Sequence, residues 1–456
     1  MSIDAPPSTP SKRFSLLSLA QRLAELAPGA AKGPVAAGAV FTMGYRCFNV
    51  LTGLAITVIL ARALGAEGFG AAALGLSTAY MLSVLCRCGA DIILIQKIPN
   101  KLESGDWAAL NGLRSFGLMI AIIGGGVVFL FGSLLAVTSF EAGPLRSALL
   151  LASAMAPLIA LNAVGQGILR GLLQARIAYL PEFVIVQSIA LVGVIVAWGA
   201  GTLTPISVLL IYAVAWCVAG ALAWIFAARA WPRAAHGVAA RRSMGVWVPA
   251  SLLIMAAGFG PLAFGKIEMI ALSVMASPEA LGLFSIAFRF AVFAAFPDFA
   301  IANAFAPSIA RLHAAGAQVE LQRKMRLGAR ATLATTVAAA AIVAVVAHAV
   351  FPLIRPEFAA AAPLAAIISL GFVGQALSGR SMDGLLMLGF AREAALASLA
   401  SLIVGFVLII LLTPPLGALG AALSTALSFT LCGALAAVFF ARRTGVRCDI
   451  LARRSA

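Results

Sequence analysis

Twelve long apolar runs dominate the sequence, and each is close to the length that a helix needs to cross a membrane. Roughly 20 mainly apolar residues span the hydrocarbon core of a bilayer. The runs form two sets of six: 35–61, 70–96, 116–138, 146–169, 180–199 and 205–228, then 246–273, 282–306, 331–353, 360–388, 393–412 and 416–440. They predict an all-α polytopic membrane protein with about twelve transmembrane helices.

The composition supports lipid as the main solvent of the chain. Hydrophobic residues make up 62% of the sequence and charged residues 11%, and the mean hydropathy is +1.05. Soluble domains are about 45–50% apolar and about 25% charged. So few charged residues cannot cover the surface of a water-soluble protein of this length.

The net charge of +16 is distributed as a membrane protein would distribute it. With both termini in the cytoplasm, 24 of the 32 Lys and Arg residues fall in cytoplasmic segments, whereas the outside loops hold Arg62, Arg146 and Arg355. Basic residues beside a helix end keep that end in the cytoplasm. We therefore predict a multi-pass protein of the bacterial inner (plasma) membrane with both termini cytoplasmic, and we expect no nucleic-acid partner.

The order of the runs predicts two helical lobes. A weak internal repeat supports them, since 67–70 matches 279–282 at an offset of 212 residues, and 175–176 matches 391–392 at an offset of 216. Two six-helix halves in the same orientation are a known transporter plan. The predicted segments are a basic cytoplasmic tail (1–34, with an amphipathic stretch near 14–26), an N-terminal lobe (35–228), a cytoplasmic linker (229–245), a C-terminal lobe (246–441) and a basic cytoplasmic tail (442–456).

Charged residues inside the runs are the candidates for function. Each costs about 2.5–3.5 kcal/mol near a helix centre, so each should face a cavity or a partner. The predicted substrate-binding cations are Arg46, Arg87, Lys266 and Arg289, and the predicted ion-coupling acids are Asp91, Glu268 and Asp298. These residues lie in the first two helices of each half, which we expect to line one cavity for an anionic substrate.

A structural reading of some of these charges stays open. Arg87 and Asp91 are four residues apart, and Arg380 and Asp383 are three apart, so either pair could simply neutralise itself on one helix face. Arg46 has no acid in its own helix, which makes it the strongest single candidate for binding. The six cysteines and three histidines are scattered, and we predict no metal, no cofactor and no catalytic residues.

Three stretches of the sequence resemble bacterial polysaccharide flippases. Residues 59–70 (ILARALGAEGFG) resemble the ARxLGxxxFG segment after the first helix of that family. Residues 415–422 (PLGALGAA) resemble the PxxGxxGAA opening of its last helix, and 386–392 resemble its turn between helices 10 and 11. Related multidrug exporters share the architecture and parts of this pattern.

The resemblance implies translocation of an undecaprenyl-diphosphate-linked oligosaccharide for exopolysaccharide or lipopolysaccharide synthesis, by alternating access through a cationic cavity. Related flippases build that cavity largely from arginines of helices 1, 2 and 8, where this chain has Arg46, Arg87 and Arg289. The implied partners are the lipid-linked oligosaccharide, a coupling proton or sodium ion, membrane lipids and the polysaccharide polymerase machinery. Two alternatives stay open: a cation-coupled multidrug exporter of the same superfamily, and a membrane polysaccharide polymerase or ligase.

Overall fold

The computed structural model describes residues 34–139, 143–298, 301 and 318–445, and every regular element in those ranges is helical. The predicted all-α fold is confirmed. The elements, in chain order, are α2 (Pro34–Arg87), α3 (Ala90–Glu103), α4 (Trp107–Ser139), α5 (Pro144–Gly171), α6 (Ala175–Ala178), η1 (Pro181–Ile185), α7 (Val186–Gly199), α8 (Pro205–Ala230), η2 (Arg233–Ala235), α9 (Met244–Ala263), α10 (Lys266–Met275), α11 (Pro278–Ala291), η3 (Val292–Ala295), α13 (Gln318–Ile354), η4 (Pro356–Ala360), α14 (Ala361–Leu377), α15 (Ser381–Met387), α16 (Ala391–Leu416) and α17 (Ala418–Thr444).

The helices account for the apolar runs. Ten helices among the described residues are long and apolar enough to cross a membrane. One of them, α2, contains two crossings because its 54 residues bend at Gly65. The helices α9 and α10 follow one another and supply a further crossing. With α2 counted twice and this pair added, the described helices match the twelve runs of the sequence.

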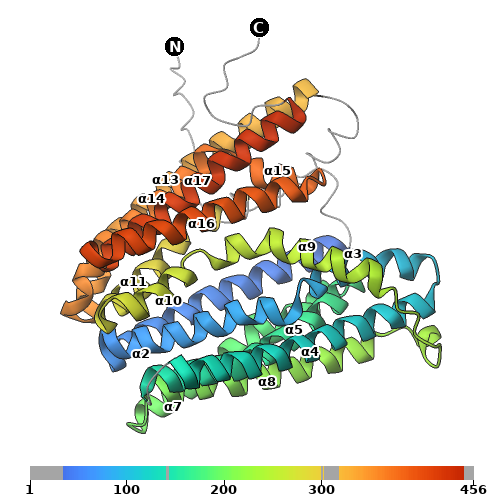
Figure 1. Ribbon diagram of the computed structural model, residues 1–456, viewed down its shortest axis with the longest axis horizontal. Coiled ribbons are helices and arrows are strands. Elements are labelled where there is room, and N and C mark those ends of the chain that lie inside the picture. The colour runs from blue at the N-terminus through green and yellow to red at the C-terminus, as the bar shows by residue number, and fades with distance from the viewer. Residues whose placement is uncertain (1–33, 140–142, 299–300, 302–317, 446–456) are drawn as a thin grey trace, which may run out of the picture.

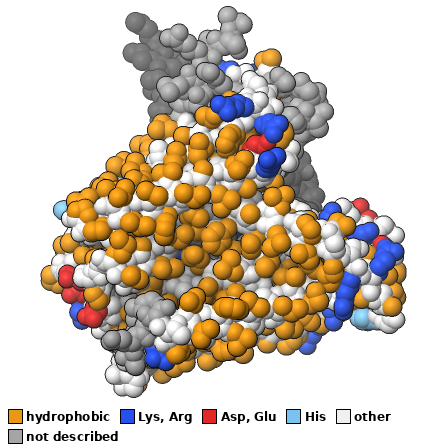
Figure 2. All heavy atoms as spheres, viewed as in Figure 1, with side chains coloured by type: hydrophobic (Ala, Val, Ile, Leu, Met, Phe, Trp, Pro, Cys, Tyr) orange, Lys and Arg blue, Asp and Glu red, His pale blue; other side chains and the backbone are white. Residues whose placement is uncertain are grey.

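The surface is suited to lipid. Figure 2 shows apolar side chains over most of the visible face, with Lys and Arg gathered toward its margins. Large apolar side chains are exposed on several helices, for example Leu130 on α4 (67% exposed), Val345 on α13 (70%) and Ile403 on α16 (65%). A band of this kind would be unfavourable in water and is favourable in the hydrocarbon region of a bilayer.

The helices form two groups, α2–α8 and α13–α17, with α9–α11 between them (Figure 1). In the first group α5 packs against α2, α4 and α8, and in the second group α17 packs against α14 and α16. The connecting helices touch both groups, since α11 packs against α2 and α14, and α9 packs against α3 and α16. The lobe boundaries at residues 228 and 246 stay a prediction.

The two groups share a core at one end only. The largest apolar cluster joins residues of α2, α5 and α8 to residues of α11, α14 and α17. At the opposite end each group has its own cluster, around Phe116 and Trp231 in the first and around Met325 and Phe440 in the second. We call the shared end the closed end (residues 62–70, 277–282 and 353–357) and the opposite one the basic end (residues 97–114, 229–245 and 388–393).

Three predicted continuous helices are broken. The run 70–96 is interrupted between α2 and α3, where Gly89 has φ 75°, and the run 246–273 is interrupted at Gly265, where φ is 78°. The run 360–388 ends as α14 and resumes as α15 after Gly379, where φ is 66°. Glycine adopts this left-handed backbone without steric cost. At Gly89 a side chain would also collide with α9, because a Cβ there would lie 2.4 Å from the Ser251 carbonyl oxygen.

The predicted connecting segments are only partly helical. Residues 318–330, which lie between the predicted runs 282–306 and 331–353, are helical and continue directly into the rest of α13. The linker 229–245 contains the single turn η2 and is fastened to the start of α4, where Arg241 pairs with Asp106 at 2.5 Å. The amphipathic stretch near 14–26 and the C-terminal tail beyond 445 lie outside the described residues.

Candidate functional site

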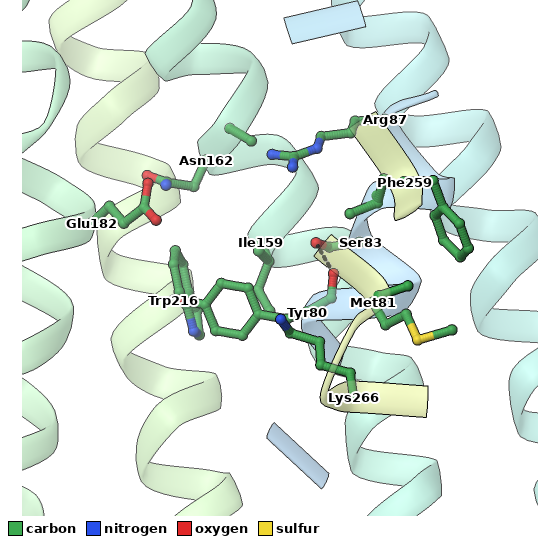
Figure 3. A pocket seen from close by; sticks show the side chains of 13 residues that line it. Tyr80, Met81, Ser83, Arg87, Ile159, Asn162, Glu182, Trp216, Phe259 and Lys266 are labelled. Atoms are coloured by element: carbon green, nitrogen blue, oxygen red, sulfur yellow. Dashed lines mark hydrogen bonds between the residues drawn. The ribbon is translucent and has the colours of Figure 1, made fainter. Parts of the chain in front are cut away.

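A cavity of about 160 Å³ lies among α2, α5, η1, α8, α9 and α10 (Figure 3). Its polar lining residues are Tyr80, Ser83, Arg87, Asn162, Glu182 and Lys266. The aromatic rings of Trp216 and Phe259 add apolar walls. Of the four helices expected to line one cavity, the second (70–96) and the seventh (246–273) do so, whereas the first (35–61) and the eighth (282–306) contribute no lining residue. The rest of the lining comes from α5, η1 and α8, which the sequence did not indicate.

Glu182 is the residue on which the cations of the first group converge. Its Oε2 accepts a hydrogen bond from Gln166 Nε2 at 2.8 Å. Arg87, Arg170 and Arg46 all interact electrostatically with this carboxylate. In Figure 3, Glu182 and Arg87 reach into the cavity from opposite sides, with Asn162 beside Glu182. The first group therefore has an acid inside an arginine cluster, at the wall of the cavity.

The local backbone explains how Glu182 reaches this position. Glu182 lies in η1, a single π-helical turn between α6 and α7 that begins at Pro181. Proline has no backbone N–H and is tolerated at the start of a helix, where that N–H would have no partner. Single π-helical turns often occur at functional sites. Glu182 is not among the predicted site residues, although it is the third residue of the run 180–199. A proline followed by an acid inside an apolar run was the available signal.

Lys266 and Glu268 lie at the break between α9 and α10, and they have different roles. Lys266 lines the cavity, and Figure 3 shows it extending from α10 toward Tyr80. Glu268 is 3% exposed and accepts a hydrogen bond from the Gly265 N–H at 2.7 Å. Glu268 therefore caps the first turn of α10 and does not line the cavity, although it was predicted as a coupling acid.

Arg46 and Arg289 lie beside the cavity. Arg46, on the first arm of α2, lies over the Phe183 ring at 5.8 Å and interacts electrostatically with Glu182. Arg289, on α11, is hydrogen-bonded to the Tyr212 hydroxyl and interacts electrostatically with the cavity residue Tyr80. All four predicted cations are thus in the cavity wall or next to a residue that forms it.

The other two predicted acids pair with arginines. Asp91 Oδ2 lies 3.5 Å from Arg87 Nη1, so this pair is formed as the structural reading of the sequence described. Asp298 and Asp383 both bind the Arg380 guanidinium, whose side chain is 2% exposed. This three-residue cluster lies apart from the cavity lining. Asp298 is therefore placed as an ion-pair partner of Arg380.

Two polar atoms of the cavity have no hydrogen-bond partner among the described residues. They are Oδ1 of Asn162 and Nε1 of Trp216, and both are buried. The Trp216 ring packs edge-to-face on Tyr80, with the ring centroids 5.6 Å apart. Buried polar atoms are normally satisfied, so these two atoms would give a ligand one acceptor and one donor after a small movement of the cavity wall.

Arginines and aromatic rings alternate where the first group approaches the basic end. Four guanidinium groups of the described residues lie over rings, namely Arg46 over Phe183 at 5.8 Å, Arg114 over Trp231 at 5.3 Å, Arg170 over Tyr179 at 5.3 Å and Arg176 over Phe41 at 4.1 Å. Cation–π contacts of this kind hold the arginine planes in place. Arg46 and Arg170 therefore each contact a ring and also interact electrostatically with the Glu182 carboxylate.

The closed end is held by polar contacts between the groups. The Ala66 N–H donates to Glu357 Oε1 at 2.7 Å. Arg355 Nε donates to the Arg62 carbonyl oxygen at 3.0 Å, and Arg62 Nη2 donates to the Leu353 carbonyl oxygen at 3.0 Å. Next to them the bend of α2 at Gly65 and the start of α11 approach so closely that a Cβ on Gly282 would lie 1.9 Å from the Ala66 carbonyl oxygen.

No group of three or more His, Cys, Asp or Glu side chains within the described ranges could hold a metal ion. The cavity instead offers two cations, one carboxylate, hydrogen-bonding groups and aromatic walls. This set can bind a molecule that is anionic at one point and polar elsewhere.

Comparisons with solved structures show the fold. The chain is similar to the inward-facing conformation of a multidrug resistance MATE family transporter of the MOP superfamily, with a TM-score of 0.70 and 14% identity over 87% of this chain and 94% of that chain. It is also similar to the lipid II flippase MurJ in an inward closed conformation, with a TM-score of 0.64 and 12% identity over 88% of this chain and 87% of that chain. No curated protein matches the sequence.

The family comparison covers more than half of the chain. The family described as "Polysaccharide biosynthesis protein" matches residues 35–313, which include α2–α11 and therefore every residue of the cavity wall. The resemblance drawn from the sequence motifs is confirmed. The chain belongs to the polysaccharide biosynthesis protein family.

Proposed function

We propose that this protein translocates an undecaprenyl-diphosphate-linked oligosaccharide across the inner membrane for surface polysaccharide synthesis, with both termini in the cytoplasm. The observation that carries the proposal is the cavity that Arg87 and Lys266 both line, in a chain of the polysaccharide biosynthesis family. The similarity of the fold to a lipid II flippase supports it. The coarser conclusion, a membrane flippase or exporter, follows from the family and the fold.

The cations suit a diphosphate. The planar guanidinium of Arg87 can donate two parallel hydrogen bonds to phosphate oxygens, and the ammonium of Lys266 acts as a compact point charge. Arg46 and Arg289 adjoin the cavity and raise the positive potential within it. Because charges inside a membrane are costly, their convergence on one cavity supports a ligand of opposite sign.

The remaining lining suits a sugar. Asn162 Oδ1 and Trp216 Nε1 lack partners among the described side chains, and sugar hydroxyls can both donate and accept. The polyprenyl tail would remain in lipid, beside the apolar surface of the helices.

Movement of the two helix groups is part of the proposal. The cavity of about 160 Å³ is smaller than the roughly 300–1,000 Å³ of sites for drug-sized ligands, so the helices of the first group and α9–α10 must move apart to admit a headgroup. The shared core and the polar contacts at the closed end would break and re-form as access changes sides. A proton or sodium gradient, or consumption of the product by a polymerase outside, would drive the cycle.

The test uses a strain that lacks the gene, complemented with wild type, Arg87→Gln or Arg323→Gln. Arg323 is an exposed cation on α13 and serves as the control. Wild type and Arg323→Gln should restore surface polysaccharide and clear the lipid-linked oligosaccharide that accumulates inside. Removing one charged hydrogen-bond partner weakens binding by about 2–5 kcal/mol. Arg87→Gln should therefore restore surface polysaccharide at least about tenfold more slowly than wild type.

Other outcomes identify the alternatives. Normal lipid-linked sugars and normal surface polymer in the strain, together with accumulation of cationic dyes, would assign the multidrug exporter. Polymerisation of lipid-linked sugars by the purified protein would assign the polymerase or ligase. Either result contradicts the flippase proposal.

A further inference from the structure

Glu182 is the one acid of the cavity lining, and it lies where the proposed substrate should bind. It accepts a hydrogen bond from Gln166 and interacts electrostatically with Arg87, Arg170 and Arg46. A carboxylate at this position has the same sign as a diphosphate. It therefore opposes substrate binding while the two compete for the same arginines.

A purely structural ion pair would not need this position. The chain has such a cluster elsewhere: Arg380 with Asp298 and Asp383, which is separate from the cavity lining. Glu182 differs because its carboxylate reaches the cavity, where a bound anion can take its place. Its flexible two-carbon stem and its single hydrogen-bond anchor, Gln166, allow the carboxylate to swing aside.

We propose that Glu182 is a built-in counter-ion that neutralises the arginine cluster while the cavity is empty and is displaced by the diphosphate of the substrate. The inference rests on the proposed function, because it needs an anionic substrate.

The need for a counter-ion comes from the return step. A carrier must change access once with substrate and once without it. Guanidinium charges without a partner are costly in a water-poor interior. Asp91 offsets one positive charge of the cluster through its pair with Arg87. Glu182 offsets another while the cavity is empty, and the diphosphate takes over that role when substrate is bound, so the excess of positive charge stays low in both halves of the cycle.

The test separates affinity from turnover. The probe is a farnesyl-diphosphate-linked N-acetylglucosamine, whose two phosphate charges do not titrate near neutral pH. Its binding is measured in nanodiscs. Its flipping is measured in proteoliposomes, with a fluorescent tag on the sugar that is reduced by dithionite from outside. The variants are Glu182→Gln, Glu182→Asp and, as the control, Asp383→Asn, which removes an arginine-paired acid away from the cavity.

Glu182→Gln should bind the probe at least about tenfold more tightly, because the charge that repels the diphosphate is gone. The same variant should flip the probe at least about tenfold more slowly, because the empty protein changes access slowly without its counter-ion. Glu182→Asp should stay close to wild type in both measurements. Asp383→Asn should keep the wild-type affinity. A merely structural role for Glu182 predicts weaker binding and slower flipping together.

Each contrary result has a definite meaning. If wild type binds and flips the probe while Glu182→Gln binds it equally or more weakly, the inference is overturned and the proposed function stands. Tighter binding with undiminished flipping overturns the role in the return step. Binding of the probe by neither protein overturns the proposed function and the inference with it.

Discussion

Replacement of Gly282 by alanine should weaken the contact that closes one end of the molecule. Gly282 lies at the start of α11, and a Cβ there would meet the Ala66 carbonyl oxygen on α2 at 1.9 Å. The atoms nearest to this Cβ are backbone atoms of Ala66, so no side chain can rotate to relieve the clash. The two helices must move apart instead.

The size of the effect follows from that distance. Carbon and oxygen approach to about 3.3 Å without strain, so α2 and α11 must separate locally by roughly 1.4 Å. Overpacking of this kind costs about 1–3 kcal/mol. Because the clash exists only while the closed end is closed, the cost shifts the opening equilibrium by about 5- to 150-fold.

Hydrogen exchange measures that shift directly. The Ala66 amide donates to Glu357 at 2.7 Å while the end is closed, so exchange in 62–70 and 353–360 should accelerate by the same about 5- to 150-fold. Gly126→Ala on α4 is the matched control, since a Cβ there meets nothing within 4 Å. Wild-type exchange in both segments of a folded Gly282→Ala protein would refute the reasoning.

Two further predictions concern charges. The hydrogen bond from the Ala109 N–H, helped by nearby cations, holds the pKa of Asp106 below its ordinary value. A carboxyl with a lowered pKa stabilises the fold above its unfolded pKa and loses that contribution as the pH falls through its folded pKa. The difference in melting temperature between wild type and Asp106→Asn should therefore be largest near neutral pH and vanish in acid. A difference that stays constant with pH contradicts this prediction. Replacing both Asp298 and Asp383 by asparagine removes both acids that bind the Arg380 guanidinium, whose side chain is 2% exposed. The double variant should lose about 3–5 kcal/mol of folding stability, measured as a melting temperature lower than that of either single variant. A double variant as stable as wild type would show that the cluster does not stabilise the fold.

Hydropathy predicted the helices of this protein but not their breaks. The run 246–273 is apolar on both sides of Gly265 apart from Lys266 and Glu268, so hydropathy averaged along it does not mark where α9 ends and α10 begins. The break depends on a left-handed glycine and on what lies beside it: a Cβ on Gly265 would lie 2.1 Å from the Phe288 ring. Phe288 is distant in sequence, and a single sequence does not reveal that contact.

The site was predictable where a charge stood alone in an apolar run. Arg87 and Lys266 were found by the cost of burying them, and both line the cavity. Spacing along one helix also identified the pair of Arg380 and Asp383, but not Asp298, which is 82 residues from Arg380. Glu182 was missed because an acid near the end of a run looks like a boundary, and only the fold shows that it points inward.

The predicted repeat relates to the closed end and to the cavity in different ways. Equivalent positions of the repeat meet at the closed end, whereas the acid of the cavity has no acidic equivalent. Gly70 and Gly282 occupy equivalent positions in the repeat and meet each other, since a Cβ on Gly70 would lie 2.7 Å from the Gly282 nitrogen. The predicted repeat would place a contact between equivalent positions near the axis that relates its two halves. The acid has no such counterpart: at the offset of 216 residues shown by 175–176 and 391–392, Glu182 corresponds to Ser398, a buried hydroxyl. Under the predicted repeat, the contact at the closed end therefore belongs to both halves, whereas the acid that we propose as the counter-ion belongs to the first half. Changes in the proposed substrate site could then occur without altering the closed end.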